Sequence, residues 1–282
     1  MFWEYIKAII YGIIEGITEW LPISSTGHLI LLEKALRFDI DTSALLYEQF
    51  SAMFDVVIQL GAILAVLFIY TKELIPLGKD KKKVFSLWQK LILATIPAAL
   101  IGLCADLLCE KYFGLSLDAL LFNPKTVASA LIVYGILFIL VEKLTTGSEK
   151  DKDITARSAL AIGFFQALAI VPGTSRSGAT ILGARILGIP REKAARFSFF
   201  AAIPVIAAAS LLKIYDFAKF SSSSAEALPT QAYFILLIAS LSAFLLSLAA
   251  IRFLTDFVKK HTFIPFGIYR IVLGVAVLIF IK

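Results

Sequence analysis

A short polar segment, residues 172–180 with the sequence PGTSRSGAT, separates two apolar runs. Ser175, Ser177 and Thr180 fall where a helix restarts, and the backbone N–H groups at the start of a helix form a site for an anion. Arg176 adds a permanent cation whose planar fork suits phosphate. These four residues therefore predict a phosphate-binding loop. The alternative, a kinked spanning helix whose hydroxyls bond to its own carbonyls, leaves Arg176 unexplained.

Two glutamates, Glu15 and Glu19, lie one helical turn apart in the first apolar segment. Their charges repel each other, and inside a membrane each is unfavourable unless a cation neutralises it. Hard divalent ions such as Mg²⁺ or Ca²⁺ bind carboxylate oxygens and keep waters or phosphate oxygens as further ligands. We therefore expect Glu15 and Glu19 to hold a divalent metal on a polyphosphate. In the alternative, the two glutamates pair with Arg176 or Arg185 for structural reasons alone.

A second hydroxyl-rich segment, PISSTGH at residues 22–28, follows the glutamates. We assign Ser24 to phosphate binding and the neighbouring Ser25 to catalysis. His28 lies three residues from Ser25, although a lone histidine is more often a satisfied core residue. The set predicts phosphoryl transfer with Ser25 as the nucleophile and Glu19 or His28 as its base. Attack by His28, or by water bound to the metal, remains open.

The composition indicates a membrane protein, because 59% of the residues are hydrophobic and only 17% are charged, with a mean hydropathy of +0.87. The net charge of +6 lies in loops between apolar segments, which favours membrane topology over a nucleic-acid partner. Cys104 and Cys109 lie five positions apart in one apolar segment and are expected to be packing residues, with neither a disulfide nor a zinc site. The first apolar run lacks the signature of a cleaved signal peptide.

The apolar pattern predicts an all-α integral membrane protein with two broken-helix hairpins and six transmembrane helices. The first hairpin joins helices at residues 6–21 and 29–36, and the second joins helices at residues 159–171 and 181–189. The helices of both hairpins are too short to span the bilayer, so the hairpins are expected to be re-entrant. The last span contains Arg270, a basic residue outside the loops that either serves the site or pairs structurally with a carboxylate such as Asp55. The six spans are expected at residues 54–70, 87–108, 124–141, 194–212, 232–252 and 265–281.

The two halves of the chain match in the order of their elements, since each contains a hairpin followed by three spans. We expect a single membrane domain, residues 1–282, built from one repeat at about residues 1–147 and another at about residues 155–282. In this alignment Glu15 corresponds to Gln166, and Ser25 to Ser175. Three crossings in each half require the second repeat to be inverted relative to the first. Inverted repeats with broken helices place a binding site near the midplane, where the two loops meet.

The distribution of basic residues predicts the orientation in the membrane. One side of the proposed topology has sixteen Lys and Arg residues and the other has eight. The richer side is expected to be cytoplasmic. Both termini and the mouth of the first hairpin then lie on the extracytoplasmic side.

With the two segments EGITEWLPISSTGH and PGTSRSGAT, the chain resembles the bacterial undecaprenyl pyrophosphate phosphatases, also called bacitracin resistance proteins. The resemblance implies an enzyme of the bacterial plasma membrane that removes one phosphate from undecaprenyl diphosphate. It implies a role in recycling this lipid carrier for peptidoglycan synthesis, resistance to bacitracin, and a divalent metal cofactor. A homodimer is one open possibility. The residues that carry over are Glu15, Glu19, Ser25, His28, Ser175, Arg176 and Thr180.

A transporter is the alternative function, because many secondary transporters are also built from inverted repeats with broken helices. A lipid-phosphate flippase or an anion carrier would use the same arginine, hydroxyls and helix ends. The carboxylates, Ser25 and His28 favour the enzyme, since a carrier needs only to bind its ligand.

Overall fold

The structure is a computed structural model that describes residues 2–76, 80–145, 152–224 and 227–280. These residues form twelve α-helices and one short 3₁₀ helix, with no strand among them. The expected all-α architecture is therefore confirmed.

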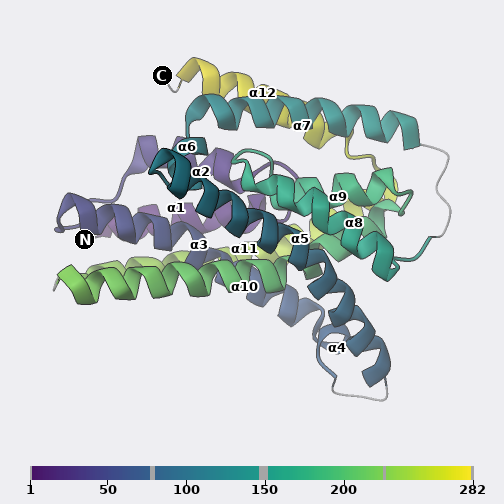
Figure 1. Ribbon diagram of the computed structural model, residues 1–282, viewed down its shortest axis with the longest axis horizontal. Helices are drawn as coiled ribbons and strands as arrows, with labels where there is room; N and C mark the ends of the chain where they lie inside the picture. Colours follow the sequence, from purple (N-terminus) through teal and green to yellow (C-terminus); the bar gives the residue numbers. More distant parts are fainter. Residues whose placement is uncertain (1, 77–79, 146–151, 225–226, 281–282) are drawn as a thin grey trace.

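The first hairpin consists of α1 (Phe2–Thr18) and α2 (Ser25–Leu36), and the second of α8 (Ala156–Ala167), the 3₁₀ turn η1 (Leu168–Ile170) and α9 (Arg176–Ile186). Neither hairpin contains one of the helices that are long and apolar enough to cross a membrane. In Figure 1, α1 begins at the end of the molecule that carries the N-terminus, whereas α8 begins at the opposite end. The hairpins thus enter from opposite ends, although an inverted relationship between the two whole halves stays a prediction.

A serine caps the returning helix of each hairpin. The Ser24 hydroxyl accepts a hydrogen bond from the N–H of Gly27 at 3.3 Å, and the Ser175 hydroxyl accepts one from the N–H of Gly178 at 3.1 Å. Since the cap ends the loop, α9 begins at Arg176 rather than at residue 181, and the expected boundary was wrong. Ser177 and Thr180 accordingly lie in the first turns of a helix and not in a loop.

The caps also correct the alignment of the two hairpins. Ser24 and Ser175 both have a positive φ, of 73° and 69°, which is uncommon for residues other than glycine. Ser24 is therefore the counterpart of Ser175, and the expected match of Ser25 with Ser175 was wrong by one residue. The same offset of 151 positions relates Gly27 to Gly178 and Glu15 to Gln166. Ser25 corresponds to Arg176, so equivalent positions of the two hairpins carry a hydroxyl in the first and a guanidinium in the second.

Five helices are long and apolar enough to cross a membrane: α3 (Ala44–Ile69), α5 (Lys81–Phe113), α7 (Pro124–Thr145), α10 (Arg191–Ser224) and α11 (Thr230–Lys260). The sixth expected span is the shorter helix α12 (Ile264–Phe280), of 17 residues. Short helices α4 (Thr71–Leu74) and α6 (Leu117–Leu121) flank α5. The helix α3 begins ten residues before the predicted span because the side chain of Ser43 caps the N–H of Leu46 at 3.1 Å.

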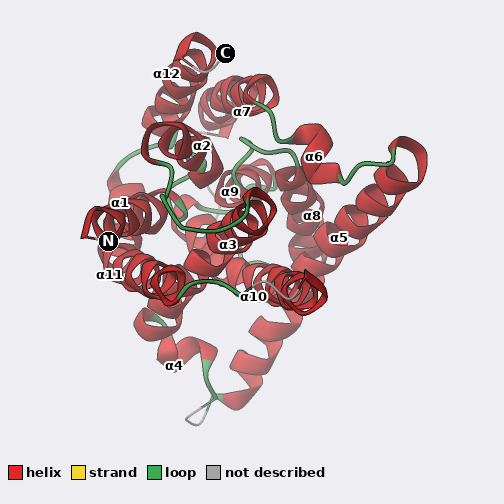
Figure 2. Ribbon diagram, turned by 90° about the vertical axis from the view of Figure 1, so that its left-hand side faces the viewer, coloured by secondary structure: helices red, strands yellow, loops and turns green. Residues whose placement is uncertain are grey.

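The long helices enclose the two hairpins (Figure 2). The first hairpin packs against α11 through α1, and the second packs against α5 through α8. The helices α7 and α12 cross at two glycines, where a Cβ atom added to Gly135 would lie 2.7 Å from the carbonyl oxygen of Gly267. Close packing of this kind is typical of small residues between membrane helices.

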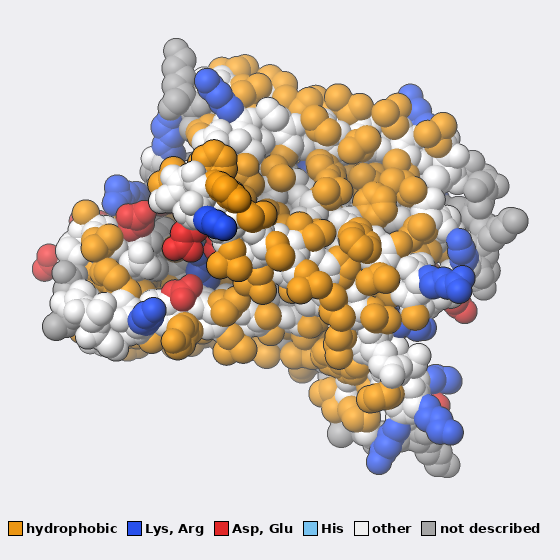
Figure 3. Space-filling model, in the orientation of Figure 1, with side chains coloured by type: hydrophobic (Ala, Val, Ile, Leu, Met, Phe, Trp, Pro, Cys, Tyr) orange, Lys and Arg blue, Asp and Glu red, His pale blue; other side chains and the backbone are white. Residues whose placement is uncertain are grey.

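The outer surface is apolar over most of the molecule, with charged side chains gathered toward its ends (Figure 3). Large hydrophobic side chains are exposed along α5, α7, α11 and α12. This distribution fits a multi-pass membrane protein. Both cysteines are free thiols, as expected, but Cys104 is exposed, so its assignment as a packing residue was wrong. The predicted boundary between the halves, near residues 147–155, lies partly outside the described residues.

Candidate active site at the hairpin tips

The two hairpin tips are joined by one carboxylate. The Ser25 hydroxyl donates a hydrogen bond to Glu19 Oε2 at 2.9 Å. The other carboxylate oxygen, Oε1, accepts from Arg176 Nη2 at 2.7 Å. All three side chains are at most about one-tenth exposed. A hydroxyl bonded to a carboxylate can be deprotonated by it, so this contact has the geometry of a nucleophile beside a base.

Arg176 is held by a second helix. Its Nη1 donates to the backbone oxygen of Ser198 on α10 at 2.6 Å. The Thr180 hydroxyl donates to the Ser198 hydroxyl at 2.7 Å, one turn further along α9. The guanidinium also lies over the ring of Trp20, 5.8 Å from its centroid. These contacts orient the arginine, and its Nε remains buried without a hydrogen-bond partner among the described residues.

Ser177 ties the backbone of the first hairpin to the second. Its hydroxyl donates to the backbone oxygen of Glu19 at 3.0 Å. The Ser175 hydroxyl lies 3.1 Å from the Ser177 hydroxyl. Both serines therefore belong to the junction, the place where the tips of the two hairpins meet. The N–H groups of Arg176 and Ser177, in the first turn of α9, have no acceptor within their own helix and are available to a ligand.

Arg270 braces both tips from α12. Its Nη1 donates to the backbone oxygen of Pro22 at 3.2 Å, and its Nη2 donates to those of Gly173 and Thr174 at 2.8 Å each. The structural pairing with Asp55 was therefore wrong. Carbonyl oxygens take the place of a carboxylate because the irregular backbone of each tip leaves them without a helical partner. The signal in the sequence was the arginine itself, since a charged residue inside a span has a function by default.

His28 lies beside the tips but makes other contacts. Its Nδ1–H donates to the backbone oxygen of Ser24 at 2.8 Å, so Nε2 is the acceptor for the Tyr269 hydroxyl at 2.7 Å. Of the two bases expected for Ser25, the one hydrogen-bonded to its hydroxyl is therefore Glu19 and not His28. Tyr269 was missed by sequence reasoning, because a tyrosine in a span carries no motif that separates it from a packing residue.

Glu15 has no partner to balance its charge. Its side chain is fully buried, and neither carboxylate oxygen has a hydrogen-bond partner among the described residues. It lies within electrostatic range of Glu19, Asp55 and Arg176. An ionised carboxylate in such a position is costly unless a cation approaches it. Glu15 therefore fits a metal ligand, whereas both oxygens of Glu19 are already engaged.

The purely structural alternative is half correct. Glu19 does pair with Arg176, but Arg185 pairs with Glu142, whose Oε1 lies 2.9 Å from Arg185 Nε. No group of three or more His, Cys, Asp or Glu side chains able to hold a metal occurs in the described part of the chain. A metal bound at Glu15 would thus depend on oxygens from the substrate or from water for most of its ligands.

Unsatisfied polar atoms gather at this junction. Buried polar atoms without a partner are few in native proteins, and each calls for an explanation. Here they include donors and acceptors that surround the tips: both oxygens of Glu15 and the side-chain nitrogens Trp20 Nε1, Arg176 Nε and Arg270 Nε. Free donors suit an anion and free carboxylate oxygens suit a cation. The residues present at the junction therefore fit a phosphate together with a cation.

Comparison with known proteins gives one consistent result. Residues 8–276 match the family described as bacitracin resistance protein BacA. An undecaprenyl-diphosphatase from Streptococcus mutans is 49% identical, over 99% of this chain and 97% of the relative. The undecaprenyl-diphosphatase of Enterococcus faecalis is 48% identical over 95% of this chain and 94% of its own length. That of Lactococcus lactis is 46% identical, over 98% and 97%.

Proposed function

Because the chain belongs to the family of the bacitracin resistance protein BacA, we propose that it hydrolyses undecaprenyl diphosphate to undecaprenyl phosphate and inorganic phosphate. The activity would recycle the carrier lipid for cell-wall synthesis and confer resistance to bacitracin. One observation carries the proposal: Ser25, Glu19 and Arg176, from two different hairpins, form a hydrogen-bonded unit.

In the proposed reaction, the Ser25 hydroxyl attacks the terminal phosphorus. The bond between that phosphorus and the bridging oxygen breaks, and undecaprenyl phosphate leaves. Glu19 accepts the proton of Ser25, to which it is already hydrogen-bonded at 2.9 Å. Water then hydrolyses the phosphoserine and restores the hydroxyl. Arg176 and the free N–H groups at the start of α9 stabilise the charge on the phosphate oxygens.

Glu15 would hold the divalent metal, Mg²⁺ or Ca²⁺, together with oxygens of the substrate. When bound, the ion neutralises charge on the diphosphate and polarises its oxygens. Glu19, which sequence analysis placed beside Glu15 as a ligand, has its two oxygens committed to Ser25 and Arg176. We therefore assign Glu19 primarily to the serine and Glu15 primarily to the metal.

We also propose that the site opens on the extracytoplasmic side of the bacterial plasma membrane, where the carrier is released after polymerisation. The distribution of basic residues supports this orientation. A homodimer stays a prediction, and the mass of the protein in detergent would check it.

The test is a phosphate-release assay on purified protein in detergent, where no compartments exist. We expect release from undecaprenyl diphosphate, and loss of most of the maximal rate in Ser25→Ala with little change in substrate affinity. The control Ser222→Ala, at the far end of α10, should retain full activity. Substrate labelled at the terminal phosphate should leave an acid-stable phosphoserine after acid quenching.

Other outcomes would point elsewhere. An acid-labile, base-stable adduct would assign the attack to His28. A high maximal rate in Ser25→Ala without any adduct would assign it to water. Binding of the lipid without any phosphate release would support a flippase or an anion carrier and overturn the proposal.

A further inference from the structure

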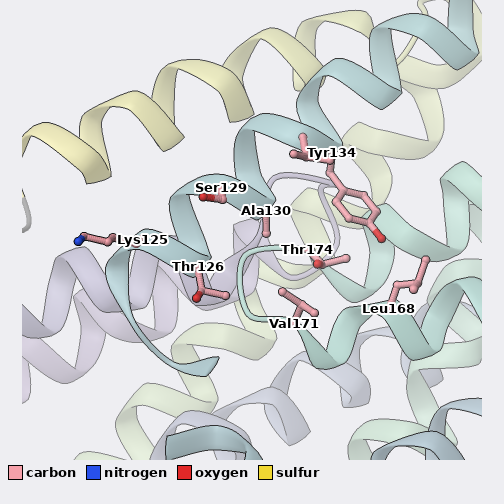
Figure 4. Close-up of a pocket in the computed structure, with 9 residues that line it drawn as sticks. Lys125, Thr126, Ser129, Ala130, Tyr134, Leu168, Val171 and Thr174 are labelled. Atoms are coloured by element: carbon pink, nitrogen blue, oxygen red, sulfur yellow. The ribbon is translucent and has the colours of Figure 1, made fainter. Parts of the chain in front are cut away.

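A cavity of about 470 Å³ lies between α7 and the tip of the second hairpin (Figure 4). One wall is a single face of α7, on which the lining residues recur at helical spacing. The opposite wall is formed by the end of the hairpin, from η1 to the residue before the cap. The lining residues are Lys125, Thr126, Ser129, Ala130, Val133, Tyr134, Leu168, Val171 and Thr174.

The two ends of this cavity differ in character. Lys125 and Ser129 lie toward one end, where the Lys125 side chain points away from the other lining residues (Figure 4). Farther along α7, Ala130 and Tyr134 lie opposite Val171, Thr174 and Leu168 (Figure 4). Ala130, Val133, Leu168 and Val171 give this lining its hydrocarbon, and Tyr134 and Thr174 add hydroxyl groups. The cavity thus has a charged side chain where α7 begins, and hydrocarbon with two hydroxyl groups nearer the hairpin tip.

The inner end of the cavity adjoins the candidate active site. Thr174 directly precedes Ser175, the cap of the helix that carries Arg176. The backbone oxygen of Thr174 accepts a hydrogen bond from Arg270 at 2.8 Å. The guanidinium of Arg270 lies 5.6 Å from the ring centroid of Tyr134, which lines the cavity. The cavity and the phosphate-binding junction therefore share a wall.

The cavity also opens toward lipid. Val133 on α7 is 52% exposed, and Leu168 on η1 is 48% exposed. Since α7 is one of the helices long and apolar enough to span the membrane, the exposed face around Val133 would meet lipid in a bilayer. A lipid could therefore reach the hairpin tip sideways, without leaving the membrane.

We propose that this cavity binds the isoprene units nearest to the diphosphate of the substrate. The inference rests on the proposed function, and it adds a chain-binding site to the phosphate site. A diphosphate held at the start of α9 places the first carbons of its chain next to Thr174. The apolar walls receive those carbons, and the lateral opening lets the rest of the chain remain in the bilayer.

The second large cavity does not compete for this role. It has a volume of about 440 Å³ and follows α2, at the segment that connects α2 to α3. Its lining includes Arg37, Asp39 and Thr42, which are charged or polar. Such a surface would leave polar groups facing a hydrocarbon chain, which is unfavourable.

The physical contribution of the cavity is positioning. Displacing one lipid tail by another releases little hydrophobic free energy, because both are equally apolar. What the walls can do is hold the branched chain so that the terminal phosphorus lies at Ser25. Filling the cavity should therefore lower the activity on prenyl diphosphates without abolishing phosphate release.

The first experiment fills the cavity with Ala130→Phe and, as a second variant, Val133→Trp. The control is Ile136→Phe, which enlarges an exposed residue on α7 outside the lining. We expect both cavity variants to lower the preference for farnesyl over dimethylallyl diphosphate, measured as the ratio of kcat/KM, by about tenfold. Most of the change should appear in KM. An unchanged ratio in two folded variants would overturn the proposal.

The second experiment needs no turnover. A methylene bisphosphonate, which cannot be hydrolysed, would carry a prenyl chain with a diazirine in its second isoprene unit. We expect light-induced adducts on residues 125–134 or 168–174, abolished by excess undecaprenyl diphosphate. Adducts confined to other helices would overturn the proposal. So would labelling of this cavity by a diazirine phosphatidylcholine that undecaprenyl diphosphate does not displace, because an ordinary bilayer lipid would then be the occupant.

The two experiments separate this inference from the proposed function. Competed labelling of the cavity by a protein that releases no phosphate would defeat the phosphatase assignment and keep the chain site. Phosphate release with an unchanged substrate preference and labelling elsewhere would defeat the chain site and keep the phosphatase assignment.

Discussion

Glu19 serves two side chains at once, and this double use shapes the chemistry of the site. One carboxylate oxygen accepts from Ser25 and the other from Arg176. The arginine thereby fixes the direction of the carboxylate, as a third residue does in other activated nucleophiles. In the proposed reaction, substrate binding then relies on Arg176 Nε, which has no partner among the described residues, and on the first N–H groups of α9, which have no acceptor within that helix.

The role of the forked Arg176 guanidinium can be tested with the change Arg176→Lys. A lysine keeps the charge, but its single nitrogen cannot contact Glu19 and Ser198 as the guanidinium does and still present a donor to phosphate. We expect kcat to fall by about a hundredfold while the protein elutes as a monodisperse species. The matched control is Arg252→Lys on the exposed surface of α11. Near-normal activity of Arg176→Lys would return Arg176 to a structural role.

The role of Glu15 as a metal ligand is testable through stability. A ligand that binds only the folded protein raises its stability, by about 2.7 kcal/mol at one hundred times its Kd. We expect Mg²⁺ or Ca²⁺, added with a bisphosphonate analogue, to raise the Tm of the wild type in detergent. Glu15→Gln should lose this increase.

Without metal, Glu15→Gln should be at least as stable as the wild type, since it removes an unpaired buried charge. Glu73→Gln, at a partly exposed ion pair on α4, should behave like the wild type and serves as the control. An equal rise in Tm for Glu15→Gln and the wild type would exclude Glu15 as a ligand.

At the scale of the elements, the hairpins are positioned by close helix contacts and by one arginine. Arg270 collects carbonyl oxygens from both tips, so the relative position of the two short helices depends on α12. The helix α12 is in turn held against α7 where Gly135 meets Gly267. The site is therefore coupled to a helix crossing that contains no catalytic residue.

The change Gly135→Ala tests this crossing. The added Cβ would lie 2.7 Å from the carbonyl oxygen of Gly267 and 2.8 Å from Ile271 Cγ1, so the helices must separate. We expect a loss of about 1–3 kcal/mol of stability, measured as a lower Tm in detergent. Gly102→Ala is the control, because its Cβ would make only ordinary van der Waals contacts with Ile170, at 3.7 Å from Cδ1 and 3.9 Å from Cγ1. A Tm for Gly135→Ala equal to that of the control would contradict the close packing.

At the scale of the whole molecule, the two ends differ in how many basic side chains they carry. Figure 3 shows many of the Lys and Arg side chains on the end that projects at the lower right, which carries α4 and the start of α5. The last turn of α10 lies at the opposite end (Figure 1). By the positive-inside rule, we expect the projecting end to lie in the cytoplasm.

Cysteine labelling of intact cells tests that orientation. Cys104 and Cys109 are first replaced by serine, because both are free thiols. A membrane-impermeant maleimide added from outside should modify Ser222→Cys, near the end of α10, and spare Lys82→Cys, near the start of α5. The reverse pattern would invert the topology and place the mouth of the first hairpin in the cytoplasm.

Much of the fold could be predicted because it depends on neighbouring residues. The length of each apolar run determines whether a helix can span, and glycines, prolines and hydroxyls in residues 22–28 and 172–180 determine where the helices break. The errors in register and in the start of α9 were also local. The caps at Ser24 and Ser175 shift the register by one residue, since a cap depends on backbone angles that the spacing from a proline does not specify.

The amino-acid sequence by itself thus determined a helical membrane protein with two polar hairpin tips and the residues that lie on them. Only the tertiary structure decided which of those residues meet. Glu19 reaches Arg176 across 157 positions, and His28 reaches Tyr269 across 241. Arg270 contacts Pro22 across 248. Such contacts arise from the packing of whole helices, so no local pattern of residue types can specify them.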